Sequence, residues 1–159
     1  MVHEASDVLA DRALRGKTVA AAESLLRILR KAVDSYGDDL ECFVIYLAIA
    51  MASTSWIMRR PDILAKVSPG GPVPDEYHRS VSRRAIAAST GLPRETVRRK
   101  IAQLVEQDFL VEAARGVRTR AGVLYERGNL AFATDLIREL ERAGAELARA
   151  GEDLGGGAG

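Results

Sequence analysis

The sequence has little of what metal-binding and catalytic sites need. It contains one cysteine, Cys42, and two histidines, His3 and His78, which lie far apart along the chain. A zinc site would need closely spaced Cys and His ligands, and a phosphate-binding loop would need a GxxxxGK[ST] or GxGxxG motif; none of these is present. A Cys–His nucleophile pair stays open, but a buried, inert thiol is the favoured interpretation. We therefore predict a protein that is not an enzyme, with no metal and no cofactor.

The chain also lacks disulfides, aromatic residues in number, and a long apolar run. With one cysteine no intrachain disulfide forms, which favours a reducing cytoplasm. The N-terminal sequence MVHEASDVLADRALRGK has no apolar segment of signal-peptide length, so we expect no export. The apolar run CFVIYLAIAMA has eleven residues, fewer than the roughly 20 of a membrane span. We expect a buried helix there, no membrane partner and a cytoplasmic location.

Aromatic residues make up only 5% of the chain, so the core must be built mainly from Ala, Leu, Val and Ile, which favours helices. Apolar residues at spacings of three and four predict amphipathic helices at 18–36 and 129–150, and a buried helix at 39–58. The first of these has an apolar stripe that includes Val19, Leu25 and Leu26, and we expect it to build a two-fold dimer together with 129–150. The prediction is a mainly α fold with four parts. They are a helical N-terminal region (1–60) for dimerisation or the core, a Pro/Gly-rich connector (61–81), a winged helix-turn-helix (82–127), and a C-terminal helix with a flexible tail (128–159).

Positive charge is concentrated in one segment of this nearly neutral chain. Residues 83–127 carry ten basic and five acidic side chains, whereas the whole chain has a net charge of +1. Nine of the ten basic residues are arginine, which suits planar, bidentate recognition of phosphates and base edges. A local field of this kind attracts a polyanion, which points to nucleic acid as the partner.

The same segment has the pattern of two helices joined by a tight turn. Ser82 is suited to cap a short helix, Gly91 to end it in the left-handed conformation, and Pro93 to open the next helix. That second helix is predicted over 94–107, with Val97, Ile101, Leu104 and Val105 buried. This spacing is typical of a helix-turn-helix.

The face of this second helix opposite its buried side carries the candidate DNA-reading residues. Recognition helices read bases with their N-terminal residues, Arg pairs with guanine, and Glu accepts from cytosine. After it, 109–113 and 119–126 are predicted as strands of a hairpin whose tip displays three arginines against phosphates or the minor groove. The predicted DNA contacts are Arg83, Arg84, Arg94, Glu95, Thr96, Arg98, Arg99, Gln103, Arg115, Arg118 and Arg120.

The stretch SRRAIAASTGLPRETVRRKIAQLVEQDFLV resembles the winged helix-turn-helix of bacterial transcription regulators. Its RETVRR core is similar to the DNA-binding half of the cyclic-AMP-receptor and fumarate–nitrate-reduction regulator superfamily. The resemblance implies that Arg94, Glu95 and Arg99 contact bases. Nothing before residue 80 looks like a β-rich cyclic-nucleotide barrel, and the order of elements is closer to the small dimeric MarR-type regulators.

The sequence thus predicts a dimeric regulator of transcription that binds double-stranded DNA, with helix 94–107 in the major groove. We expect a homodimer seam at Leu136, Ile137, Leu140 and Leu147. The alternative is a winged helix used for protein–protein assembly without DNA readout. A small-molecule effector is a further possible partner, and its pocket would be lined by apolar and aromatic residues of one helix. These are Cys42, Tyr46, Met51, Trp56 and Met58.

Overall fold

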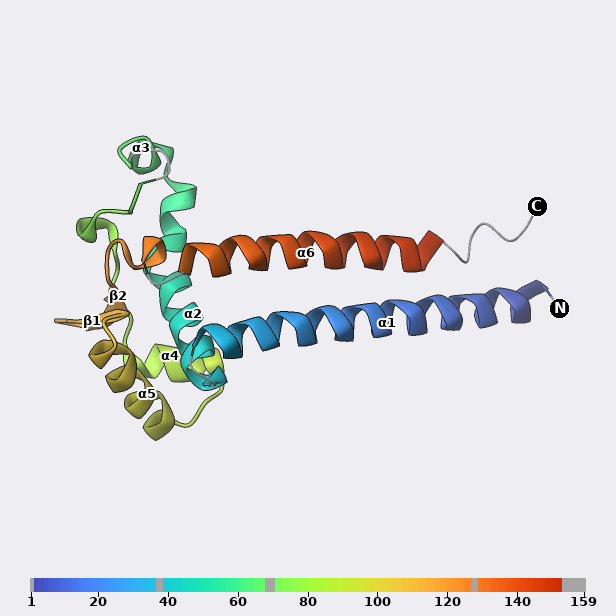
Figure 1. The fold of residues 1–159 in the computed structure, drawn as a ribbon, viewed down its shortest axis with the longest axis horizontal. Helices are drawn as coiled ribbons and strands as arrows, with labels where there is room; N and C mark the ends of the chain where they lie inside the picture. Colours follow the sequence, from blue (N-terminus) through green and yellow to red (C-terminus); the bar gives the residue numbers. More distant parts are fainter. Residues whose placement is uncertain (1, 37–38, 68–70, 127–128, 153–159) are drawn as a thin grey trace. The chain divides into compact units, whose positions relative to one another are not determined.

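The computed structural model describes residues 2–36, 39–67, 71–126 and 129–152, and most of these residues are helical (Figure 1). With its one small antiparallel sheet, the structure confirms the predicted mainly α class. The chain forms two compact units. The hairpin unit comprises Met1–Ala32 and Ala131–Gly159, and the core unit comprises Val33–Leu130. The flexible tail was predicted from Gly151 onward; helix α6 instead continues to Glu152, and the residues from 153 onward lie outside the described residues.

The hairpin unit is built from two long antiparallel helices, α1 (Val2–Ser35) and α6 (Asn129–Glu152) (Figure 1). Helix α1 begins sixteen residues before the predicted start at Thr18. Its first half is rich in Ala, Leu and Arg, which favour helix, and Gly16 does not break it. A Cβ built on Gly16 would lie 3.9 Å from the Cβ of Ala150, so this glycine is a close-contact position between the two helices.

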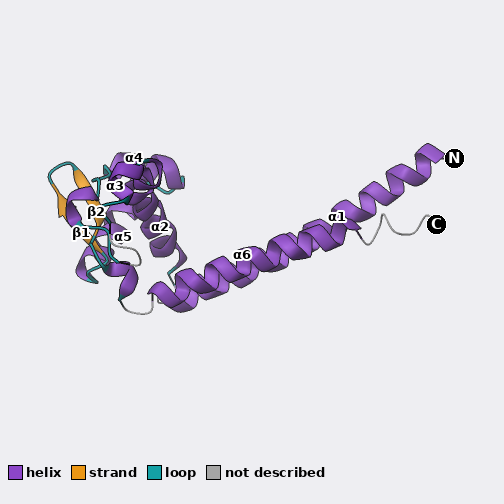
Figure 2. Ribbon diagram, turned by 90° about the horizontal axis from the view of Figure 1, so that it is seen from above, coloured by secondary structure: helices purple, strands orange, loops and turns teal. Residues whose placement is uncertain are grey.

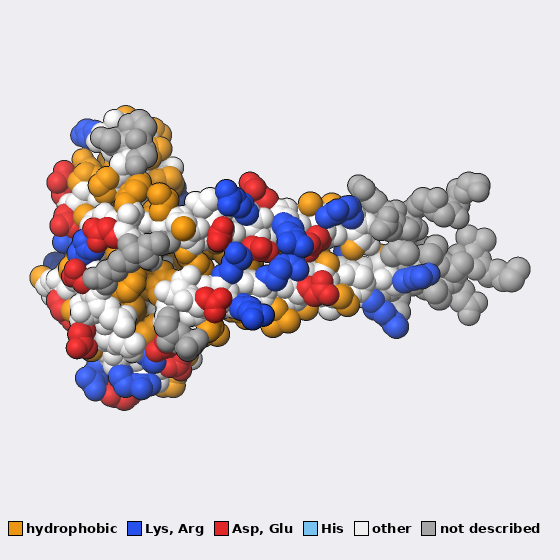
Figure 3. Space-filling model, viewed as in Figure 1, with side chains coloured by type: hydrophobic (Ala, Val, Ile, Leu, Met, Phe, Trp, Pro, Cys, Tyr) orange, Lys and Arg blue, Asp and Glu red, His pale blue; other side chains and the backbone are white. Residues whose placement is uncertain are grey.

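Ion pairs join α1 to α6. The Arg27 guanidinium contacts Glu139 at 3.0 Å and Glu146 at 2.8 Å, and Lys31 contacts Asp135 at 3.2 Å. Figure 3 shows basic and acidic side chains interleaved along this pair. The stripe residues Val19, Leu25 and Leu26 are 58%, 55% and 66% exposed within one chain. They project from the face of α1 opposite its seam with α6.

The core unit contains the remaining helices and the β-hairpin (Figure 2). Its α-helices are α2 (Leu40–Thr54), α3 (Pro61–Leu64), α4 (Arg83–Thr90) and α5 (Arg94–Glu106). Short 3₁₀ turns lie at Ser55–Arg59, Asp75–Tyr77 and Val123–Tyr125. The strands are β1 (Leu110–Ala113) and β2 (Gly116–Thr119). Helix α2 packs against α4, α5 and β2, so it belongs with residues 82–127 and not to a separate N-terminal region.

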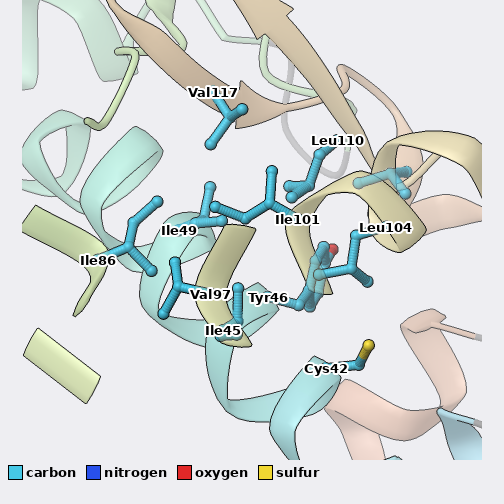
Figure 4. Packing of buried hydrophobic residues seen from close by; sticks show 11 residues of the cluster. Cys42, Ile45, Tyr46, Ile49, Ile86, Val97, Ile101, Leu104, Leu110 and Val117 are labelled. Carbon is cyan, nitrogen blue, oxygen red and sulfur yellow. The ribbon is translucent and has the colours of Figure 1, made fainter. Parts of the chain in front are cut away.

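The core lies between α2 and α5. Ile49 of α2 lies beside Val97 and Ile101 of α5, and all three are fully buried (Figure 4). Helix α2 begins at a cap in which Asp39 Oδ1 accepts from the Cys42 amide at 3.0 Å. By length and composition alone, Leu40–Arg59 is apolar enough to cross a membrane; about 39% of this stretch is buried inside the protein.

The β-hairpin formed by β1 and β2 is shorter than the sequence predicted. Strands β1 and β2 pair from Leu110↔Thr119 to Ala113↔Gly116, which leaves only Ala114 and Arg115 at the tip. The prediction of a returning strand over 119–126 is wrong, because the chain turns at Gly122 with φ +78° and continues into a 3₁₀ turn. On its other edge, β2 pairs with Val81 through a single antiparallel bridge.

Candidate nucleic-acid interface

Helices α4 and α5 are joined by the tight turn that the sequence predicted. Ser82 Oγ accepts from the Ala85 amide at 3.2 Å and caps α4. Gly91 ends α4 with φ +71°, in the left-handed region where glycine carries no steric penalty. Leu92 is partly buried against the core between the two helices. The turn therefore fixes the direction of α5 relative to α4.

Helix α5 has one fully buried side and one charged outer side. Val97, Ile101 and Leu104 are 0% exposed, which confirms three of the four predicted buried positions; Val105 is partly buried. At 100° per residue, Glu95 and Arg99 lie on the opposite side of the helix, flanked by the half-buried Gln103 and Thr96. The outer side of α5 is thus available to a partner along its first three turns.

Glu95 and Arg98 form a bidentate ion pair one turn apart on α5. Arg98 Nε lies 2.9 Å from Glu95 Oε2, and Arg98 Nη2 lies 2.6 Å from Oε1. These hydrogen bonds lower the pKa of Glu95, so the carboxylate stays ionised at neutral pH. Both oxygens of Glu95 are held by one arginine, whereas the sequence assigned both residues separately to DNA.

Four arginines and Glu95 line an open hollow between the N-terminal ends of α4 and α5. Its volume is about 390 Å³, and its lining residues are Arg83, Arg84, Arg94, Glu95 and Arg98. Arg83 pairs with Glu112 of β1, and Arg98 pairs with Glu95. Among the described residues, neither Arg84 nor Arg94 has a carboxylate partner. The hollow therefore combines two neutralised arginines with two uncompensated ones.

The three hairpin arginines are not together at the tip. Arg115 is there, exposed, between the two strands. Arg118 lies two residues into β2, where it pairs with Asp75 and donates to Thr119 O at 3.2 Å. Arg120 follows the strand and pairs with Glu126, and its Nε donates to Asp108 O at 3.0 Å. The prediction of a three-arginine tip is wrong for Arg118 and Arg120 because the strands turn earlier than expected.

Lys100 has a structural role that the sequence did not reveal. The residue is 8% exposed, its ammonium pairs with Asp39, and Glu41 lies 3.7 Å away. Burial alone would raise the pKa of Asp39, but hydrogen bonds from Lys100 and from Cys42 bring it below its ordinary value. This pair ties α5 to the N-terminus of α2. No local signal marks a partner 61 residues away.

His78 of the connector (61–81) contacts β2 with its side chain. Its Nδ1 lies 2.8 Å from the hydroxyl of Thr119, and its Nε2 lies 3.1 Å from Val73 O. Thr119 is 3% exposed, so the contact is largely shielded from solvent. Together with the Asp75–Arg118 pair, it fixes residues 73–78 against β2.

The residues proposed for an effector pocket have different surroundings. Cys42 and Tyr46 lie in the core, and burial raises the pKa of the Cys42 thiol to about 12. Met51 and Met58 are 53% and 64% exposed. Trp56 Nε1 donates to the carbonyls of Ser53 and Tyr77, beneath the Arg79 guanidinium.

Acidic, His and Cys side chains nowhere gather in threes suited to a metal ion within the described ranges. Comparisons of the chain with protein-family models, with curated proteins and with solved structures find no match.

Proposed function

We propose that the core unit is a winged helix-turn-helix that binds double-stranded DNA and regulates transcription. The observation that carries the proposal is the outer side of α5, where Glu95 and Arg99 are exposed opposite the buried residues, with Arg94 and Arg98 on the flank toward α4. Helix α5 follows a short helix and a Gly91 turn and precedes a two-stranded hairpin, which is the order of a helix-turn-helix with a wing.

Helix α5 enters the major groove with its N-terminal end in this proposal. Arg99 lies directly opposite the buried side and pairs with guanine, and Gln103 one turn later pairs with adenine. Glu95 accepts from a cytosine amino group. Arg115 at the hairpin tip contacts a phosphate or the adjacent minor groove, while Arg118 and Arg120 keep the wing in shape through their acidic partners.

Duplex binding measured across a salt range tests this function. Each neutralised phosphate contributes about −0.9 to the slope of log K against log salt. A regulator with several contacts should lose on the order of a hundredfold in affinity between about 50 and about 200 mM salt. Selection of bound sequences from a random duplex library then gives the operator. A flat salt response would contradict the proposal and favour a protein–protein assembly module.

The regulator is proposed to act as a homodimer through its hairpin unit. Ile137 and Leu140 of α6 are 57% and 55% exposed, and Leu14 and Leu26 of α1 are 63% and 66% exposed. These side chains form apolar stripes on faces turned away from the ion-paired seam between the two helices. A dimer that binds two half-sites one DNA turn apart, about 34 Å, should have a pseudo-palindromic operator.

Charge placed in the stripes tests the dimer. Leu26→Glu with Leu140→Glu should shift sedimentation from dimer to monomer at micromolar concentration and weaken operator binding. Both substituted positions are already exposed, so helix content should change little. Arg149→Glu, at an exposed position of α6 on a different face from Ile137 and Leu140, should leave the dimer intact. A wild-type monomer that footprints a single half-site would contradict this proposal.

A further inference from the structure

We propose that the arginine-lined hollow between α4 and α5 is a binding site for a single phosphate group. The inference rests on the proposed function, because the phosphate is taken to be one of the DNA backbone. It changes the role of Arg94 from a reader of bases to a holder of the backbone.

The charge balance of the hollow supports an anion. The side chains of four arginines line a hollow of about 390 Å³, and Glu95 carries the one carboxylate among its lining residues. Both oxygens of Glu95 are occupied by Arg98, and the charge of Arg83 is offset by Glu112. Arg84 and Arg94 keep their full charge and exposed side chains. A phosphate between them would receive charge-assisted hydrogen bonds in bidentate geometry.

The position of Arg94 on α5 separates it from the reading face. Arg99 lies directly opposite the buried residues, whereas Arg94 and Arg98 project from the side of α5 that faces α4. A helix that inserts Arg99 into the major groove turns this side toward the sugar–phosphate strand that borders the groove. The outer side of α5 therefore reads bases with Arg99, and the hollow fixes the register through one phosphate.

Glu95 determines how many arginine charges the hollow offers to a phosphate. As long as it holds Arg98, the hollow offers only the charges of Arg84 and Arg94 without a partner. Glu95→Gln would release Arg98 as an additional phosphate ligand. We therefore expect Glu95→Gln to increase the affinity for random duplex several-fold while it weakens discrimination at the base pair read by Glu95.

Two variants and one matched control test the phosphate site on DNA. Arg84→Gln and Arg94→Gln should each weaken selected and random duplexes by the same factor, about tenfold, and reduce the salt slope by about one per subunit. Arg30→Gln removes an exposed charge from α1 and should change neither. A set of duplexes, each with one neutral methylphosphonate linkage at a different position, should identify the phosphate that the hollow binds. When that phosphate is neutral, Arg94→Gln should no longer weaken binding. If Arg94→Gln alters base preference as Arg99→Gln does, or if no linkage couples to it, the inference is wrong.

A measurement without DNA separates this inference from the proposed function. Pyrophosphate should raise the Tm of the wild-type protein and leave the Tm of the Arg84→Gln/Arg94→Gln double variant unchanged. If the protein binds no duplex but shows this difference, the hollow is a phosphate site whose source is a free phosphorylated molecule. If pyrophosphate stabilises both proteins equally and no linkage couples to Arg94, the hollow binds no phosphate.

Discussion

Replacing Gly116 with alanine tests how the hairpin is joined to the helices. Gly116 has φ +141°, and a Cβ built there would lie 2.1 Å from the carbonyl oxygen of Val81 and 2.6 Å from its carbonyl carbon. Both atoms are backbone, so the overlap is relieved only if the segment before α4 moves away from β2. That movement breaks the two hydrogen bonds between Val81 and Val117, with N–O distances of 2.7 and 3.0 Å.

The expected cost follows from these contacts. A residue forced into this backbone region loses roughly 1–3 kcal/mol, and each broken hydrogen bond costs about 0.5–1.5 kcal/mol. Gly116→Ala should therefore lower the free energy of unfolding by about 4 kcal/mol, which leaves a domain of ordinary stability still folded. Gly91→Ala is the matched control. Gly91 has φ +71° with no atom within 4 Å of its Cβ position, so only the left-handed conformation costs energy, roughly 1–2 kcal/mol.

Urea denaturation followed by circular dichroism measures both variants, and amide hydrogen exchange at Val81 and Val117 reports the bridge directly. Exchange at these two amides should accelerate in Gly116→Ala and stay unchanged in Gly91→Ala. Equal destabilisation by the two substitutions, with the bridge amides still protected, would show that the clash at Val81 does not decide the cost.

The remaining predictions concern the Asp39–Lys100 ion pair, the arginines proposed to contact DNA, and Arg118, which is proposed to stabilise the wing. Asp39→Asn keeps a capping oxygen but removes the charge facing Lys100, so it should cost about 2 kcal/mol at neutral pH. Because the pKa of Asp39 is lowered in the folded state, the wild-type protein is more stable than Asp39→Asn above about pH 4. It should fade as the pH falls through that lowered pKa, as urea titrations at several pH values would show. Arg99→Gln should cost about 1–3 kcal/mol on the selected operator and relax base preference, as competition binding would reveal. Arg115→Gln should weaken all duplexes equally, whereas Arg118→Gln should chiefly lower the Tm through loss of the Asp75 pair.

Local patterns predicted the segment around α4 and α5 well because each signal acts over a few residues. The cap at Ser82, the left-handed Gly91 and the buried Val97 and Ile101 all follow from spacing within one or two helical turns. The Glu95–Arg98 pair was also within reach of the sequence, since its members are three residues apart on a helix.

Contacts between distant segments were not predictable in this way. Asp75 with Arg118, and Lys100 with Asp39, join residues separated by 43 and 61 positions, and nothing near either member marks its partner. The β-hairpin is also joined to a distant segment. Val81 pairs with Val117, and the carbonyl of Val81 leaves room only for a glycine at position 116.

The helix pair α1/α6 shows why periodicity does not identify the partner of an apolar stripe. The spacing of Leu25 and Leu26 correctly marks an apolar face of α1, but α6 binds the other face, where Ser24 and Arg27 meet Glu146. Partly exposed ion pairs contribute little stability, since solvent screens them. The ion pairs therefore orient the two helices more than they stabilise them. The apolar side chains on the outer faces contribute free energy only where something covers them, which is the physical basis for placing a second copy there.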